Sequence, residues 1–306
     1  MKPHGGIFMM TIRRPEDFQH HFAQLPDIKL HYVREGSGPA IVLCHGWPGF
    51  WWEWHMNIGP LAENFDVIVP DMRGYGESEK PPLDQIQLFH IDRVVDDWAH
   101  LLDHLGIDRA YMVGHDYAAL GLHKFVRKYR DRVIKAAIFD PIVPGFESRY
   151  LSAAHFPESW YSQFHQLDMA VDLVSSSRQA TKIYFKHFLS HWSYNKNLFT
   201  EEELEIYTDN FVKPGNIHGG FNFYRANLSL SSRPWTELDR TISDVPVTFI
   251  QGMGDTVVPS VWTDLVASWY NNYTIEYVPD GGHFIMREKP DYINRRLKEA
   301  FLGATQ

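Results

Sequence analysis

The sequence contains a single cysteine, Cys44, among its 306 residues. One cysteine cannot form an intrachain disulfide, and so little cysteine is typical of proteins from a reducing cytosol. Long apolar runs are also missing. Ile7–Met10 is the one apolar run near the N-terminus, and it is too short for a secretion signal or a membrane span. We therefore expect a soluble cytoplasmic protein with no membrane partner.

Positive charge is in deficit, because 29 Lys and Arg face 38 Asp and Glu, for a net charge of −9. This balance disfavours nucleic acids and anionic membrane surfaces as partners. Aromatic side chains, in contrast, make up 15% of the chain and include ten tryptophans. Most such side chains serve core packing, but they also suit a cavity for an apolar organic substrate.

Strand and helix patterns alternate along most of the chain, which predicts a mostly parallel sheet covered by helices on both faces. A chain of this length needs no disulfide or metal for stability, since it buries about three quarters of its unfolded surface. The expected strands are residues 28–35, 40–44, 66–69, 110–113, 134–139, 247–251 and 274–278, and the expected helices include 91–105, 118–130 and 260–269.

Residues 144–235 lack any convincing buried strand pattern and look helical instead. Thr200 and Glu203 form a capping box at the start of one helix there. Ser231–Pro234 has the composition of an exit linker. We expect an α/β core of residues 1–143 and 236–306, interrupted by an all-helical cap of residues 144–235.

An aspartate, Asp116, stands where the strand that ends at Val113 turns into a helix. Small residues at Gly114, Ala118 and Ala119 let strand and helix approach closely, as in the nucleophile elbow that usually holds a serine. Asp116 is either the N-cap of that helix or a nucleophile projected into a cavity. A carboxylate is a nucleophile that needs no base, because it is already ionised near neutral pH.

Two further ionisable residues follow predicted strands, Asp255 after residues 247–251 and His283 after 274–278. Nucleophile, acid and histidine is the chain order of α/β-hydrolases. A rival acid, Asp140, follows the strand at 134–139. Asp116 and His283, with Asp255 or Asp140 as the acid, therefore form a candidate triad.

From about Met10 to the C-terminal helix the chain resembles the α/β-hydrolase superfamily, and within it the bacterial epoxide hydrolases. The resemblance implies an α/β-hydrolase fold that converts epoxides to vicinal diols, as in detoxification, with a small apolar epoxide and water as partners and no cofactor or metal. The residues that carry it are His45-Gly46-Trp47-Pro48, the loop Asp71–Ser78, Gly114–Ala119, Tyr161, Tyr224, Asp255 and His283.

In the implied reaction Asp116 attacks a carbon of the epoxide and forms an alkyl ester, which water then hydrolyses. His283 is the general base for that water, and Asp255 orients its imidazole. Backbone N–H groups of Trp47 and Tyr117 bind the oxyanion. The resemblance further suggests a cis peptide bond before Pro48.

Tyr161 and Tyr224 match the positions where epoxide hydrolases carry the acids that open the ring. Packing is the alternative for this pair, since Tyr184, Tyr194 and Tyr207 also lie in the expected cap. A halide leaves as a stable anion and needs no acid, so a haloalkane or haloacid dehalogenase with the same triad is the first alternative function. Tyr117 weakens it, because dehalogenases usually carry tryptophan there. The second alternative function is that of a ligand-binding homologue without turnover.

The sequence also predicts pocket-lining and supporting roles for residues outside the triad. Trp47, Phe50 and Trp51 are expected walls of the substrate pocket. His45 is expected to brace its loop, and Arg73 and Ser78 to hold the core together. His187 and His191 have metal-ligand spacing but no third ligand, which favours a solvated pair. Gly252-Met253-Gly254 lacks the third glycine of a dinucleotide-binding loop, so we expect no such site there. The sequence is compatible with both a monomer and a homodimer.

Overall fold

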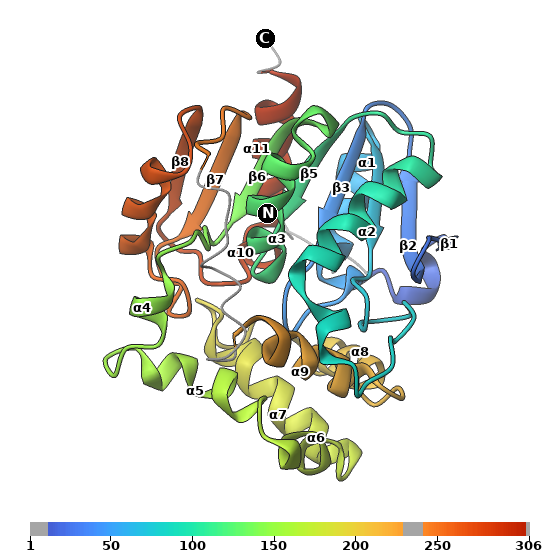
Figure 1. The fold of residues 1–306 in the computed structure, drawn as a ribbon, viewed down its shortest axis with the longest axis vertical. Coiled ribbons are helices and arrows are strands. Elements are labelled where there is room, and N and C mark those ends of the chain that lie inside the picture. The colour runs from blue at the N-terminus through green and yellow to red at the C-terminus, as the bar shows by residue number, and fades with distance from the viewer. Residues whose placement is uncertain (1–11, 229–240, 304–306) are drawn as a thin grey trace, which may run out of the picture.

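The protein, represented by a computed structural model, is described for residues 12–228 and 241–303. Within these residues eight strands form one sheet in the order β1-β2-β4-β3-β5-β6-β7-β8. The pairings β1–β2 and β2–β4 are antiparallel, and the rest are parallel. Helices α2 and α3 cover one face and α1 and α11 the other (Figure 1). The predicted α/β-hydrolase architecture is confirmed.

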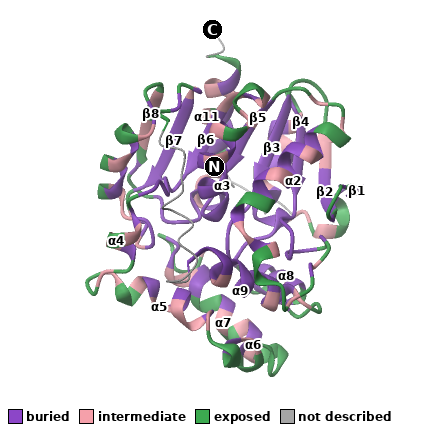
Figure 2. Cartoon of the chain, viewed as in Figure 1, coloured by how far each residue is buried: buried purple, intermediate pink, exposed green. Residues whose placement is uncertain are grey.

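Buried side chains fill the sheet and the helices that cover it, and they continue through the loops at the strand ends into the helices that follow β6 (Figure 2). The strands are β1 (His20–Gln24), β2 (Lys29–Gly36), β3 (Ala40–Cys44), β4 (Asp66–Pro70), β5 (Ala110–Gly114), β6 (Val133–Phe139), β7 (Val247–Gly252) and β8 (Tyr273–Val278). The helices of the core are α1 (His55–Ala62), α2 (Ile91–His104), α3 (Tyr117–Lys128), α10 (Ile285–Glu288) and α11 (Pro290–Leu302).

All seven predicted strands are present, but β1 escaped prediction. It is a short edge strand whose central apolar residue, Phe22, is 48% exposed, so no buried alternation marks it in the sequence. The helix predicted at 260–269 is the 3₁₀-helix η5 (Ser260–Ser268). Its β-branched Val261, Thr263 and Val266 are poor α-helix formers, which agrees with the tighter winding.

Six helices follow β6 and gather at one end of the sheet, in the lower part of Figure 1. They are α4 (Glu147–Tyr150), α5 (Phe156–Phe164), α6 (Asp168–Ser175), α7 (Arg178–His191), α8 (Glu201–Phe211) and α9 (Asn216–Asn227). No strand interrupts them over the described part, residues 144–228, and the capping box of Thr200 and Glu203 is present. The apolar run Ile7–Met10 and the linker Ser231–Pro234 lie outside the described residues, and the domain limits stay a prediction.

The strand register brings the carboxyl ends of the parallel strands to one level. Cys44 on β3 pairs with Gly114 on β5, and Gly114 pairs with Ile138 on β6. On the other side, Gly252 on β7 pairs with Val278 on β8. The loops after these strands therefore meet at a single edge of the sheet. No helix of the described residues is long and apolar enough to cross a membrane.

Candidate active site

Asp116 occupies a strained turn between β5 and α3. Its φ of 54° and ψ of −117° lie outside the regions that a side chain favours, at a cost of about 1–3 kcal/mol. Its side chain makes no capping bond to α3. Instead Oδ1 accepts a hydrogen bond from the backbone N–H of Trp47 at 2.7 Å. The geometry therefore matches a nucleophile elbow and not the N-cap alternative.

Two glycines allow the backbone to close around this turn. A Cβ atom at Gly46 would lie 2.3 Å from the Cβ of Asp116, far inside van der Waals contact. A Cβ at Gly114 would lie 2.9 Å from the carbonyl oxygen of Ala118. Glycine at these two positions is what lets the loop after β3 approach Asp116 and α3 pack against β5.

The three residues of the predicted triad meet. His283 Nδ1 lies 3.0 Å from Asp255 Oδ2, and its Nε2 lies 3.7 Å from Asp116 Oδ2. The other oxygen of Asp255 accepts hydrogen bonds from the backbone N–H groups of Val257 at 2.7 Å and Val258 at 3.0 Å. These bonds fix the Asp255 carboxylate, which in turn orients the imidazole toward Asp116.

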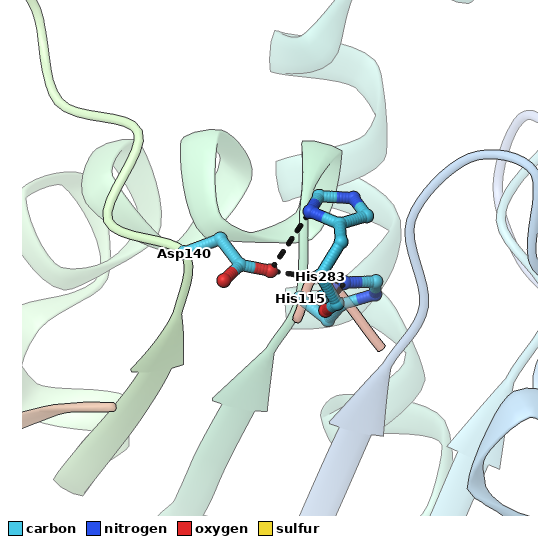
Figure 3. Close-up of side chains that lie close together, drawn as sticks. All are labelled: His115, Asp140 and His283. Carbon is cyan, nitrogen blue, oxygen red and sulfur yellow. Dashed lines mark hydrogen bonds and ion pairs between the residues drawn. The ribbon is translucent and has the colours of Figure 1, made fainter. Parts of the chain in front are cut away.

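A second carboxylate contacts the same ring nitrogen of His283. Asp140 Oδ2 lies 3.3 Å from His283 Nδ1 and 3.1 Å from His115 Nε2, and Figure 3 shows it contacting both rings. Burial and the nearby charge of Asp255 raise the pKa of Asp140 to about 7. Burial also acts on Asp255, but His283 outweighs it and lowers the pKa of Asp255. Asp255 thus suits a permanent anion, whereas Asp140 exchanges a proton near neutral pH.

The carboxylates control the protonation of His283. Burial favours the neutral imidazole, but Asp255, Asp140 and Asp116 outweigh it and hold the pKa of His283 well above its usual value. Loss of the negative charge on any one of them lowers this pKa. The protonation state of His283 therefore depends on whether Asp116 is an anion.

Glu53 and His115 extend this network beneath the elbow. Glu53 Oε1 accepts from the backbone N–H of Gly46 at 3.3 Å and lies 3.3 Å from His115 Nδ1. Burial opposes a charge on His115, but Glu53 and Asp140 outweigh it and raise the pKa of His115 to about 9. Sequence reasoning missed Glu53, whose one signal is an acid within the aromatic run Trp51–Trp54.

His115, Asp140 and His283 are residue types that bind metal ions, and their ligand atoms lie within 4.8 Å of one another. In this structure Asp140 already contacts both imidazoles. His115 is further engaged with Glu53, and His283 with Asp255. These mutual contacts favour a proton network over a metal site.

Tyr161 on α5 and Tyr224 on α9 face the elbow from the helical end. The Trp47 ring stacks on Tyr161 with centroids 5.2 Å apart and meets Tyr224 edge to face at 5.6 Å, while Tyr117 meets Tyr224 at 4.8 Å. The two tyrosines are 2% and 1% exposed. Burial raises the pKa of each well above its usual value, so both hydroxyls keep their protons.

The competing tyrosines are placed differently. The hydroxyl of Tyr184 lies 2.7 Å from His165 Nε2, Tyr194 is 52% exposed, and Tyr207 packs against Phe50. Among these tyrosines of the helical segment, Tyr161 and Tyr224 are therefore the ones that pack around Trp47.

The expected pocket walls divide into two groups. Trp47 packs against the two tyrosines, as described above. Phe50 and Trp51 instead border a cavity of about 290 Å³, shared with Arg14, His20 and Lys213 among others. The ring of Trp51 contacts His20 at 5.3 Å, and none of its ring contacts within the described residues reaches Tyr161 or Tyr224.

The peptide bond before Pro48 is cis, as the resemblance suggested. His45 braces its loop through Nε2, which accepts from the backbone N–H of Met72 at 3.0 Å. Arg73 is paired with Asp97 at 2.6 Å. The hydroxyl of Ser78 donates to the carbonyl of Asp71 and accepts from the backbone N–H of His31.

His187 and His191 lie on α7, where their rings stack and His191 pairs with Glu158.

Known proteins resemble this chain in sequence and fold over most of its length. A family model described as the alpha/beta hydrolase fold matches residues 39–290. The "Soluble epoxide hydrolase" of Corynebacterium sp. (strain C12) is 30% identical over 286 residues, covering 90% of this chain and 95% of that protein. "Epoxide hydrolase 1" of Caenorhabditis elegans is 26% identical over 298 residues, covering 95% and 72%.

A solved structure extends the likeness to three dimensions. The structure "Epoxide hydrolase CorEH without ligand" superposes with a TM-score of 0.84 at 29% identity, covering 93% of this chain and 99% of that one. The chain therefore belongs to the α/β-hydrolase family, in which it groups with the soluble epoxide hydrolases.

Proposed function

We propose that the protein hydrolyses epoxides to vicinal diols through a covalent ester on Asp116. The observation that carries the proposal is the pair of buried, protonated tyrosines, Tyr161 and Tyr224, that packs around Trp47 beside the elbow. An epoxide oxygen leaves as a strongly basic alkoxide and requires an acid, whereas a halide does not. The names of the relatives support the same choice.

In the first step a carboxylate oxygen of Asp116 attacks a ring carbon of the epoxide. The carbon–oxygen bond of the ring breaks, and a proton from Tyr161 or Tyr224 passes to the departing oxygen. The product is a hydroxyalkyl ester of Asp116. Trp47 N–H, bonded to Asp116 Oδ1, leaves the oxygen that faces His283 free for the attack.

In the second step water attacks the carbonyl carbon of the ester. Formation of the ester removes the negative charge of Asp116, which lowers the pKa of His283, so that its Nε2 proton passes to the tyrosinate left by ring opening and Nε2 becomes the base. Nε2 then takes a proton from the attacking water and gives it to the diol oxygen as the bond between that oxygen and the Asp116 carbonyl carbon breaks. The proton of the released Asp116 carboxyl passes to His283, which restores the starting ion pair. The N–H groups of Trp47 and Tyr117 stabilise the oxyanion, since Tyr117 begins α3 and its N–H has no acceptor within the helix. The site therefore produces its base only after the substrate is attached.

We further propose that residues 144–235 form a cap that closes over the reacting groups. Helices α5 and α9 supply Tyr161 and Tyr224, while Asp116 belongs to the core, so the site is complete only when the two parts meet. Cap residues would then determine which epoxide reaches Asp116. A cytoplasmic location and a monomeric or dimeric state stay predictions from the sequence.

The haloacid alternative is disfavoured by the distribution of buried cations. A haloacid carboxylate needs a cation beside the nucleophile, but the buried arginines of the described residues, Arg73 and Arg287, are paired with Asp97 and Glu203. Within the same residues the ion-pair partner of Asp116 is His283. Haloalkanes carry no charge, so they remain the substrates to compare with epoxides.

A substrate panel tests the proposed function. The purified protein is incubated with styrene oxide, 1,2-epoxybutane, 1-chlorobutane, 1-bromobutane and chloroacetate. We expect diol from the epoxides and no halide release, measured by chromatography and by a chloride and bromide assay. Halide release without diol would identify a dehalogenase, and the absence of both products would favour the ligand-binding alternative.

Replacement of either cap tyrosine should slow ring opening. We expect Tyr161→Phe and Tyr224→Phe each to lower kcat/KM for styrene oxide by about 10- to 100-fold, since one acid remains, and the double variant nearly to abolish turnover. Tyr207→Phe, a buried cap tyrosine elsewhere, is the matched control. Full activity in the double variant would remove the acid role from both residues.

The shared contact at His283 Nδ1 leads to a prediction about the two acids. Asp255→Asn should lower kcat by less than the roughly 10⁴-fold seen when a triad acid has no substitute, because Asp140 lies 3.3 Å from the same nitrogen. Asp255→Asn combined with Asp140→Asn should reach that full loss. Steady-state kinetics on Asp255→Asn, Asp140→Asn and the double variant measure these losses, and a full loss in Asp255→Asn alone would contradict a contribution from Asp140.

A further inference from the structure

Tyr150, the last residue of α4, makes the one hydrogen bond that the described residues give to the hydroxyl of Tyr161. Tyr150 Oη donates to Tyr161 Oη at 3.0 Å. Both side chains are buried, Tyr150 at 5% exposure. A phenolic oxygen accepts through its lone pairs and donates its single proton separately. When Tyr150 is the donor in this pair, the proton of Tyr161 is available for another acceptor.

We propose that Tyr150 is a positioning residue for ring opening. Its hydroxyl holds Tyr161 so that the free O–H points to the epoxide oxygen, and it then stabilises the negative charge that develops on Tyr161. This inference rests on the proposed role of Tyr161 as an acid. Sequence reasoning did not single out Tyr150, which lies eleven residues before Tyr161 on a separate short helix.

Ring opening conserves both charge and protons. A bond forms between a carboxylate oxygen of Asp116 and the ring carbon, and the ring carbon–oxygen bond breaks. The proton of Tyr161 moves to the departing oxygen, so the negative charge that began on Asp116 ends on the oxygen of Tyr161. The proton of Tyr150 stays in place, and its hydrogen bond becomes a stronger, charge-assisted one.

The hydroxyls of Tyr161 and Tyr224 differ in their hydrogen-bond partners. The hydroxyl of Tyr224 accepts no hydrogen bond from the described residues, and its interaction with the neighbouring Tyr117 hydroxyl has Tyr224 as the donor. Tyr161 has a donor in Tyr150, and burial raises the pKa of Tyr150, which keeps that donor protonated. Tyr161 is therefore the principal proton donor of the pair, and Tyr224 the second hydrogen bond to the epoxide oxygen.

A double-mutant cycle on the alkylation step tests this inference. Excess enzyme is mixed with styrene oxide, quenched in acid at increasing times, and the ester is followed by intact mass. We expect Tyr150→Phe to slow ester formation by about tenfold, and to leave the rate of ester hydrolysis unchanged. In a Tyr161→Phe background the further change Tyr150→Phe should have no effect. Tyr207→Phe is again the matched control.

The outcomes separate this inference from the proposed function. If Tyr161→Phe does not slow ester formation, the acid role of Tyr161 fails. If Tyr161→Phe slows it but Tyr150→Phe does not, or if Tyr150→Phe still acts without the Tyr161 hydroxyl, the positioning role is overturned. If Tyr150→Phe does not fold, Tyr150→Leu, which also lacks the hydroxyl, replaces it in the cycle. We expect it to slow ester formation to the same extent.

Discussion

Replacement of His283 by alanine is expected to stop the reaction halfway and to accumulate the alkyl ester on Asp116. The carboxylate needs no base for its attack, whereas hydrolysis of the ester does, and His283 Nε2 lies 3.7 Å from Asp116 Oδ2. Turnover should fall by about 10⁴-fold or more. Intact mass should show the protein heavier by one molecule of styrene oxide, and the increase should persist for hours.

A surface histidine supplies the control for this experiment. His187→Ala removes an imidazole that stacks on His191 in the cap, and it should neither trap an ester nor slow turnover. Peptide mapping of the His283→Ala adduct should locate the added mass on the peptide that contains Asp116. A variant that keeps its turnover and accumulates no ester would show that His283 is not the base.

Replacement of Asp116 by asparagine should abolish both the ester and the diol. Asparagine has the shape of aspartate, and its side-chain oxygen can still accept the hydrogen bond from Trp47 N–H, so the elbow should persist. The neutral amide is a poor nucleophile, and we expect kcat to fall by at least about 10⁴-fold. Diol formation from styrene oxide measures the loss.

An unchanged unfolding temperature must accompany this loss, because Asp116 is strained and its neighbourhood is tightly packed. Intact mass excludes residual aspartate in the preparation. Activity within tenfold of the unaltered protein would mean that Asp116 is not the nucleophile and that water attacks the epoxide directly.

The parts of the site that sequence reasoning predicted are those tied to strand ends. Because parallel strands end at one edge of the sheet, Asp116, Asp255 and His283 are expected to meet although the first and the last are 167 positions apart in the sequence. Small residues around Asp116 indicated the elbow itself. The strained φ at Asp116 then follows from the sharp turn that such an elbow requires.

What the sequence did not indicate depends on contacts through space. Asp140 and Asp255 both approach Nδ1 of His283, and this shared contact depends on the positions of their two loops in the fold. Glu53 reaches His115 from a segment rich in tryptophan, and Tyr150 reaches Tyr161 across a turn between two short helices. None of these pairings has a spacing or a periodicity that a single sequence reveals.

A single turnover in ¹⁸O-water tests the covalent route most directly. Excess enzyme is mixed with styrene oxide in labelled water, and the diol is analysed by mass spectrometry. The account predicts an unlabelled first diol, because one oxygen comes from the epoxide and the other from the carboxylate of Asp116, while the label enters that carboxylate. Label in the diol of the first turnover would contradict the ester intermediate.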